Sequence, residues 1–332
     1  MKTSIKKGYA LIIANANYKY NPSVQSCAKD GKDMAKILTI LGFDVMELYD
    51  ANRDETIAHI SDFISHSNSY STLLLYYSGH GIQMDGKNYF VPVDCKYMDD
   101  KSVFIDTQLV DMDIVTNSMD SNQKTNIIIL DACRTPLSFV GGLTQEGLAE
   151  FDIKNDVFIA FSTSPNKAAI GSSLATENSI YTRYLIQHIY EPNIKIEDVF
   201  KKVRSDVDKH TGGLQIPWES TSLKKDFFFN CMSKDEFNEK IYQIIRIDHS
   251  ANTLCLLSDI LQKSISDICR TYWRQKAEKP GGIHIHSEEE FEKFILEHIL
   301  DLGFSYVNYR WVYNDKAVQM GEFFHNYKDF SR

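Results

Sequence analysis

Two short stretches carry side chains that can act together as a nucleophile and a base. Cys133 follows the β-branched apolar run Asn126–Leu130, and His80 follows the apolar run Ser71–Tyr77. Each run is too short for an amphipathic helix and lacks the alternation of a half-exposed strand. Each therefore predicts a strand that is buried on both faces of a parallel sheet.

Reactive groups in open α/β sheets gather outside the carboxyl ends of the strands, which is where Cys133 and His80 are expected. An imidazole there can take the proton of a thiol and later give it to a leaving amine. Glycines on both sides of His80 predict a tight turn with close backbone approach. The alternatives are that Cys133 is a small buried hydrophobe and that His80 is an ordinary turn residue.

Five groups of residues occur in the order found in one family. They resemble motifs of caspase-like cysteine peptidases, on the metacaspase and bacterial side of that clan, over residues 8–230 or so. The groups are Tyr76-Tyr-Ser-Gly-His-Gly81; Leu130-Asp-Ala-Cys-Arg134; Leu11 to Tyr18 with Cys27-Ala-Lys-Asp30; Thr176 to Leu185; and Gln215 to Leu223 with Asp226-Phe-Phe-Phe229. Five ordered motifs are far more specific than a single short one.

The resemblance implies a role for each matched residue. His80 is the expected general base and acid, and Cys133 the expected nucleophile, which forms a thioester that water hydrolyses. The N–H groups of Gly81 and Cys133 are the expected oxyanion hole. Asp30 and Asp131 match the acidic positions of a pocket for Arg or Lys before the scissile bond. Alternatively, Asp30 caps the next helix and Asp131 orients a turn.

Composition narrows the function classes. The chain has 332 residues, of which 43% are hydrophobic and 24% charged, and it carries a net charge of −9. That charge argues against nucleic acid as a partner, and the resemblance implies protein substrates. No apolar run approaches 18 residues, so no membrane segment is expected. Six scattered cysteines indicate reduced thiols, and a cytoplasmic location is the corresponding expectation.

Predicted strands and helices alternate along residues 9–230, as in a parallel sheet covered on both faces. The resemblance implies a caspase–haemoglobinase-like α/β fold: a three-layer αβα arrangement with a mostly parallel six-stranded sheet. The pattern of the residues after it predicts a small C-terminal α+β domain. The expected strands are 9–14, 43–48, 71–77, 89–93, 126–130, 156–162 and 226–229, and the expected helices are 31–41 with Asp30 as N-cap, 53–66, 106–119, 181–190 and 196–207.

The resemblance ends near residue 230, which divides the chain into a peptidase domain, 1–230, and a regulatory or sensor domain, 231–332. The second part predicts a helix from Ser287 to about Leu302 and then an aromatic strand over 304–313. Aromatic rings beside a cation can stack a nucleotide base, and the alternative is that they are there because strands and cores favour aromatic residues. The candidate ligand-binding residues are Tyr306, Tyr309, Arg310, Trp311 and Tyr313.

Bacterial relatives with such extensions often act in antiviral defence, which makes a nucleotide messenger a candidate activator. Lys154 follows the stretch where family zymogens are often cut, and control without any cut is the alternative. Calcium stimulates many metacaspases, but the loop 83–88 carries only Asp85, so neither calcium nor another metal or cofactor is predicted. Two other functions remain open: an inactive scaffold or adaptor, and a cysteine acyl hydrolase that is not a peptidase.

Overall fold

The structure is a computed structural model, and it divides into two compact units, Met1–Cys231 and Met232–Arg332. It describes residues 6–119, 124–133, 156–164, 177–233, 236–237, 240–241, 256, 304–307, 310–313 and 316–318.

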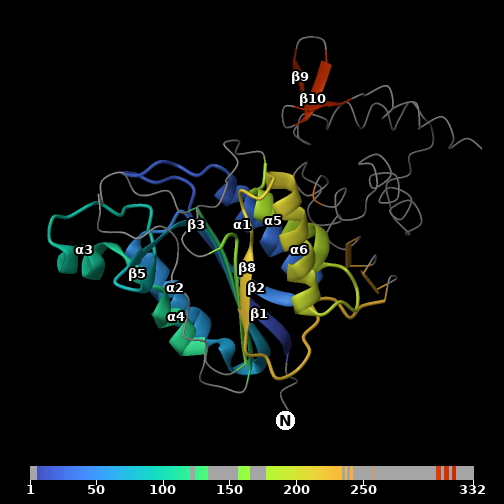
Figure 1. Ribbon diagram of the computed structural model, residues 1–332, viewed down its shortest axis with the longest axis horizontal. Helices are drawn as coiled ribbons and strands as arrows, with labels where there is room; N and C mark the ends of the chain where they lie inside the picture. The colour runs from blue at the N-terminus through green and yellow to red at the C-terminus, as the bar shows by residue number, and fades with distance from the viewer. Residues whose placement is uncertain are drawn as a thin grey trace, which may run out of the picture. The chain divides into compact units, whose positions relative to one another are not determined.

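A mostly parallel sheet forms the centre of the first unit (Figure 1). In spatial order its strands are β2 (Phe43–Tyr49), β1 (Lys6–Ala14), β3 (Tyr70–Met84), β6 (Thr125–Cys133), β7 (Val157–Phe161) and β8 (Trp218–Thr221). The pairs from β2 to β7 are parallel, and β8 is antiparallel to β7. Two short strands, β4 (Lys87–Phe90) and β5 (Val110–Asp111), extend the far end of β3 by antiparallel pairing.

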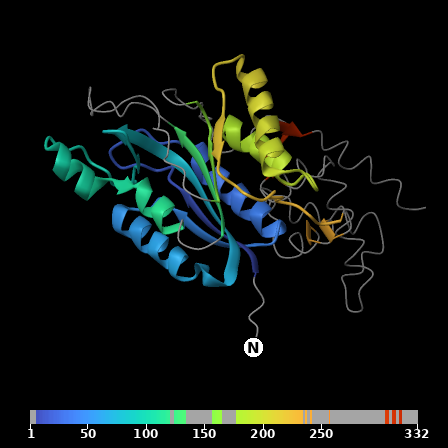
Figure 2. The same ribbon diagram turned by 60° about the horizontal axis from the view of Figure 1, so that its bottom comes forward.

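Helices cover both faces of this sheet. The helices α1 (Ser26–Ile40), α5 (Ile180–Ile189) and α6 (Ile196–Thr211) lie on one face. On the other face lie α2 (Arg53–Ser65) and α4 (Met112–Met119), and Figure 2 shows the same layers turned. A short 3-10 helix, η1 (Ser67–Ser69), follows α2, and α3 (Lys101–Gln108) precedes β5. The predicted three-layer α/β fold is confirmed.

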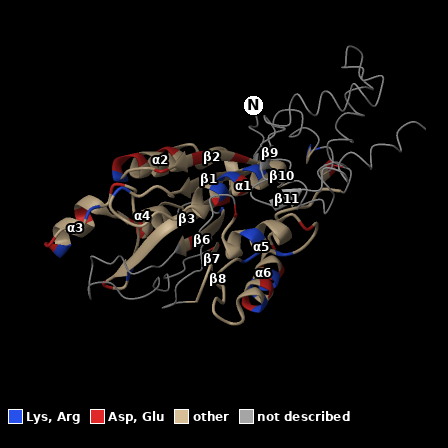
Figure 3. Cartoon of the chain, turned by 90° about the horizontal axis from the view of Figure 1, so that it is seen from above, with Lys and Arg blue, Asp and Glu red and all other residues tan. Residues whose placement is uncertain are grey.

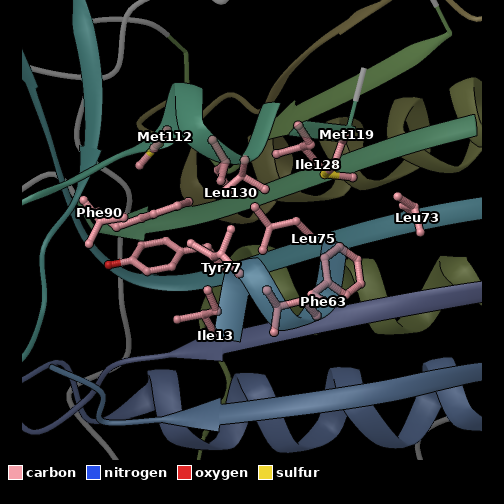
Figure 4. Close-up of a cluster of buried hydrophobic side chains, with 14 of the residues drawn as sticks. Ile13, Phe63, Leu73, Leu75, Tyr77, Phe90, Met112, Met119, Ile128 and Leu130 are labelled. Carbon is pink, nitrogen blue, oxygen red and sulfur yellow. The ribbon is translucent and has the colours of Figure 1, made fainter. Parts of the chain in front are cut away.

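Burial on both faces explains why the strand sequences do not alternate. In β1, Leu11 and Ile13 pack into the cluster that Phe63 of α2 and Met119 of α4 complete (Figure 4). Ile12, which lies between them in the strand, is also fully buried, against the opposite layer. Because successive side chains of a strand point to opposite faces, a strand in the middle layer must be apolar at every position.

The helices carry the charge that the strands lack. Figure 3 shows Lys, Arg, Asp and Glu mainly on helices and connections, with the sheet almost free of them. In α6, Val199, Val203 and Val207 are buried at intervals of four residues, so they form one stripe along the helix. The helix ends at Gly212, whose positive φ of 59° suits a residue without a side chain.

Two predictions next to the expected site are wrong. The helix predicted over 31–41 begins at Ser26 with Gln25 as its N-cap, so Asp30 lies inside α1 and does not cap it. The residues around His80 form no turn, because β3 continues to Met84. In this part of β3 the strand pairs with β6 as far as His80 and with β4 from Gly81 onward.

Two further element predictions also need correction. The helix predicted over 106–119 is two helices, α3 and α4, with the short strand β5 between them. The stretch 226–229 does not close the sheet; β8 does, and Phe228 forms only an isolated bridge with Lys195. Phe227 and Phe229 are buried, and burial rather than strand pairing accounts for their apolar character.

The second unit contains a small antiparallel sheet in the order β11 (Lys316–Val318), β10 (Arg310–Tyr313), β9 (Phe304–Val307). The strand predicted over 304–313 is therefore a hairpin of two strands. The helix predicted from Ser287 to about Leu302 lies outside the described residues.

Candidate active site

The fold places the predicted base and nucleophile on neighbouring strands. His80 of β3 and Cys133 of β6 are Cα partners in the last register pair that joins these two parallel strands. Neighbouring strands lie about 4.8 Å apart, so the two backbones meet at the distance of a single strand spacing. Residues separated by 53 positions in the sequence are thereby brought opposite each other.

The His80 imidazole is buried, with an exposed fraction of 1%, and a main-chain group orients it. Its Nε2 lies 2.7 Å from the carbonyl oxygen of Pro22. A carbonyl can only accept, so Nε2 carries the proton and Nδ1 of the neutral ring is left as the basic nitrogen. Pro22 escaped the sequence analysis because it acts through a main-chain atom, for which no residue type is a signal.

Two tyrosines hold the main chain of His80. The Tyr18 hydroxyl accepts the His80 backbone N–H at 2.7 Å, and the Tyr77 hydroxyl donates to the His80 carbonyl at 2.6 Å. The Tyr18 ring also packs against the imidazole, with 4.4 Å between the ring centroids. Both tyrosines lie within the motifs of the sequence analysis, but neither was assigned a role.

Asp30 of α1 is fully buried and held by the segment that leads into α5. Its Oδ1 accepts from Asn178 Nδ2 at 3.0 Å and from the Ser179 backbone N–H at 2.9 Å. Ser78 of β3, two residues before His80, donates its hydroxyl to Asp30 Oδ2 at 3.4 Å. Asp30 therefore joins α1 to the strand that carries the histidine.

Asp131 of β6 lies two residues before Cys133 and contacts the same segment. Its Oδ2 accepts from the Ser179 hydroxyl and, at 2.8 Å, from the Thr182 hydroxyl. Asp131 is also the register partner of Ser78, which hydrogen-bonds Asp30. The structure thus brings both predicted pocket residues together, beside the strand ends of the site.

These two carboxyls are electrostatically unusual. Burial, and then the neighbouring Asp131, raises the pKa of Asp30 well above its ordinary value. Burial likewise raises the pKa of Asp131. Within the ranges that the structure describes, no Lys or Arg side chain forms an ion pair with either carboxylate. The site therefore offers two buried acids whose ionised forms are not matched by a cation there.

The remaining predicted site residues are placed as follows. Gly81 follows His80 in β3, opposite Phe90 of β4, and Lys154 lies outside the described residues. In the second unit Tyr306 pairs with Trp311, Arg310 with Val307 and Tyr313 with Phe304, while Tyr309 lies outside the described residues.

The described part of the chain has neither a metal-ligand cluster nor a membrane-spanning helix. It contains no group of three or more His, Cys, Asp or Glu side chains arranged to hold a metal ion. Asp85, the acid of the loop where calcium was considered, forms an ion pair with Lys101 at 2.6 Å. None of the helices described there is long and apolar enough to span a membrane.

The fold and site define an α/β protein in which a histidine and a cysteine face each other where the parallel pairing of two neighbouring strands ends. A family model of the caspase domain matches residues 7–228, and the chain belongs to this family.

Relatives agree with this assignment. The human mucosa-associated lymphoid tissue lymphoma translocation protein 1 is 29% identical over 178 residues, which cover 47% of this chain and 21% of that protein. Caspase-1 from Rattus norvegicus is 26% identical over 260 residues, which cover 69% of this chain and 60% of that protein. The chain thus spans about a fifth of the human relative and less than two thirds of the rat one.

Proposed function

We propose that the protein is a cysteine endopeptidase, and the register of His80 opposite Cys133 carries this proposal. His80 Nδ1 takes the thiol proton, and the Cys133 thiolate attacks the scissile carbonyl carbon. The imidazolium then protonates the leaving amine as the C–N bond breaks, which leaves a thioester. Water, deprotonated by His80, releases the acid and restores the thiol. The N–H groups of Gly81 and Cys133 are the proposed donors to the oxyanion.

The proposed specificity is for Arg or Lys before the scissile bond. Asp30 and Asp131 are buried next to the strand ends, and their raised pKa values show that the folded protein penalises their ionised forms. A guanidinium or ammonium group bound between them would supply a countercharge, which the described residues do not provide. Two carboxylates suit the planar donors of arginine in particular.

The edge of the sheet offers a place for the substrate backbone. β8 is the last strand in the described order, and Trp218 at its start is 44% exposed. An extended peptide can add to such an edge by main-chain hydrogen bonds, while an exposed indole contacts a substrate side chain. We assign this docking role to β8.

Hydrolysis of fluorogenic peptides tests the proposed function. The panel carries Arg, Lys or Asp before the leaving group and compares wild type with Cys133→Ala. Cleavage after Arg or Lys that the alanine variant lacks is the expected result. Cysteine-dependent cleavage after Asp alone would refute the specificity, and a folded protein that hydrolyses none of the peptides would favour a scaffold or adaptor.

We further propose that the unit Met232–Arg332 controls the peptidase as a ligand-gated regulator. A compact second unit on a chain with a peptidase-family domain supports this role. A nucleotide messenger of antiviral defence, acting in the cytoplasm, is the proposed signal, and cleavage after Lys154 is a proposed processing step. Nucleotide-dependent thermal stabilisation and hydrolysis by the full chain are the expected results. Activity that is the same with and without every nucleotide tested would refute this control.

A further inference from the structure

We propose that Tyr18 and Tyr77 are positioning residues whose hydroxyls bracket the main chain of His80 and hold its imidazole in the reactive orientation. The inference rests on the proposed function, in which His80 is the base. We call this pair of hydroxyls the tyrosine bracket.

The bracket holds both polar groups of the His80 main chain. The His80 N–H donates to the Tyr18 hydroxyl, and the Tyr77 hydroxyl donates to the His80 carbonyl. A phenol has one hydrogen, and that of Tyr77 is used on the carbonyl. The donor and the acceptor of the His80 main chain are therefore both tied to side chains.

Burial keeps the bracket in its neutral, hydrogen-bonding state. Tyr18 is 7% exposed and Tyr77 is fully buried. Burial raises the pKa of Tyr18 well above its ordinary value and also raises that of Tyr77. Both phenols therefore stay protonated over the pH range in which a histidine works as a base.

Gly79 is required by the same arrangement. A Cβ atom at this position would lie 2.7 Å from the Tyr18 hydroxyl oxygen and 2.7 Å from the Tyr77 hydroxyl oxygen. The residue before the histidine must therefore be glycine for both hydroxyls to reach the main chain of His80. The close approach predicted from the Gly-His-Gly sequence exists, and its partners are these hydroxyls.

The loop that contains Tyr18 and Pro22 contacts both the main chain and the ring of His80. Tyr18 accepts the His80 N–H, and Pro22, four residues later, accepts from the imidazole Nε2. The loop between them is fixed to the segment after β4, because the Lys19 N–H donates to the Val93 carbonyl at 2.8 Å. The direction of Nδ1 therefore depends on a loop that contacts the main chain and the ring of His80 together.

Steady-state kinetics with Arg and Lys peptides test the bracket in the full chain. We expect Tyr18→Phe and Tyr77→Phe to lower kcat by about tenfold or more, with KM within about twofold, because misplacement of a catalytic group costs rate rather than binding. The double variant should lose less than the product of the single losses, since both hydroxyls act on one residue. Tyr9→Phe is the matched control: this buried tyrosine lies in β1, opposite Leu73, at the strand end away from the site.

A merely structural role has a different signature. It would lower Tm in Tyr18→Phe and Tyr77→Phe but leave kcat as in Tyr9→Phe, and that result would overturn the proposal. If one of the two bracket variants does not fold, the kcat and Tm of the other variant alone test the proposal. If wild type shows no Cys133-dependent hydrolysis, the peptidase proposal fails, and the pH profile of Cys133 alkylation by iodoacetamide then tests the bracket. A profile shifted in the bracket variants and unshifted in Tyr9→Phe supports it, and three superimposable profiles would overturn it.

Discussion

Asp30→Asn should stabilise the protein and at the same time damage its proposed specificity. The amide has nearly the shape of the carboxylate, and its oxygen can keep accepting from Asn178 and from the Ser179 N–H. Ser78 can rotate its hydroxyl to accept from the new amide nitrogen. The main change is therefore the loss of a buried negative charge beside Asp131.

The stability gain can be estimated from these contacts. A buried carboxylate without a cation costs several kcal/mol of desolvation. Changing its two close hydrogen bonds from charged to neutral acceptors loses about 1 kcal/mol each. A net gain of about 1 kcal/mol or more remains, which raises Tm by about 2–4 °C for a domain of this size.

The pH dependence follows from the raised pKa of Asp30. The folded state holds this proton more tightly than the unfolded chain, so wild type loses stability as pH rises from about 4, the ordinary carboxyl value, through the raised value. Asp30→Asn removes that loss. The Tm difference between the variant and wild type should therefore be largest at neutral pH and vanish near pH 4, as measured by calorimetry across this range.

Activity should move in the opposite direction. Removing one partner of a buried charge pair costs about 2–5 kcal/mol, which is at least about 30-fold in kcat/KM for Arg and Lys peptides. Asp33→Asn is the control, since Asp33 is buried one turn further along α1 and pairs with Lys29 at 2.5 Å. That variant should lose stability and keep the specificity. Asp30→Asn with a lower Tm at pH 7 and unchanged kcat/KM would refute the reasoning.

Three other substitutions have definite expected outcomes. Phe63→Ala should cost about 3–5 kcal/mol in urea unfolding, because it empties a fully buried site between α2 and the sheet; a loss below 1 kcal/mol would contradict this packing. His188→Gln should lower Tm without changing kcat, since the ring lies 2.6 Å from Glu191 and 2.7 Å from Asp206, bridging α5 and α6; an unchanged Tm would show that the bridge is not stabilising. Trp218→Ala should raise KM several-fold at constant kcat, and an unchanged KM would exclude substrate contact at β8.

The central strands could be predicted because burial on both faces makes their sequences apolar at nearly every position. Asn126–Leu130 and Ser71–Tyr77 are apolar at nearly every position, as the middle of a covered sheet requires, and each is followed by polar residues where the strands approach the site. The placement of His80 and Cys133 just beyond these two runs could therefore be predicted. Their register opposite each other and the continuation of β3 to Met84 could not, because both depend on pairing with distant strands.

The errors arose where distant segments decide the local structure. Gly79 and Gly81 are typical of a turn, but β4 and β6 pair with this stretch and keep it extended. Asp30 is a good N-cap residue, yet α1 starts at Ser26, and its N-cap residue is Gln25, whose side chain makes no capping hydrogen bond. Packing, rather than capping, sets the start of this helix, and packing is not visible in a short window of sequence.

Whether a site residue could be predicted depends on whether its role needs a particular side chain. Residues proposed to react or to bind charge, such as His80 and Asp131, must have particular side chains, so their types are a signal. The orientation of His80 depends instead on the carbonyl of Pro22, which any residue could supply, and on two phenols with no reactive role. A histidine whose side chain and main chain are both held by hydrogen bonds loses little entropy when it acts as a base. Substitutions at Tyr18 and Tyr77 should therefore reveal how much of the rate depends on orientation alone.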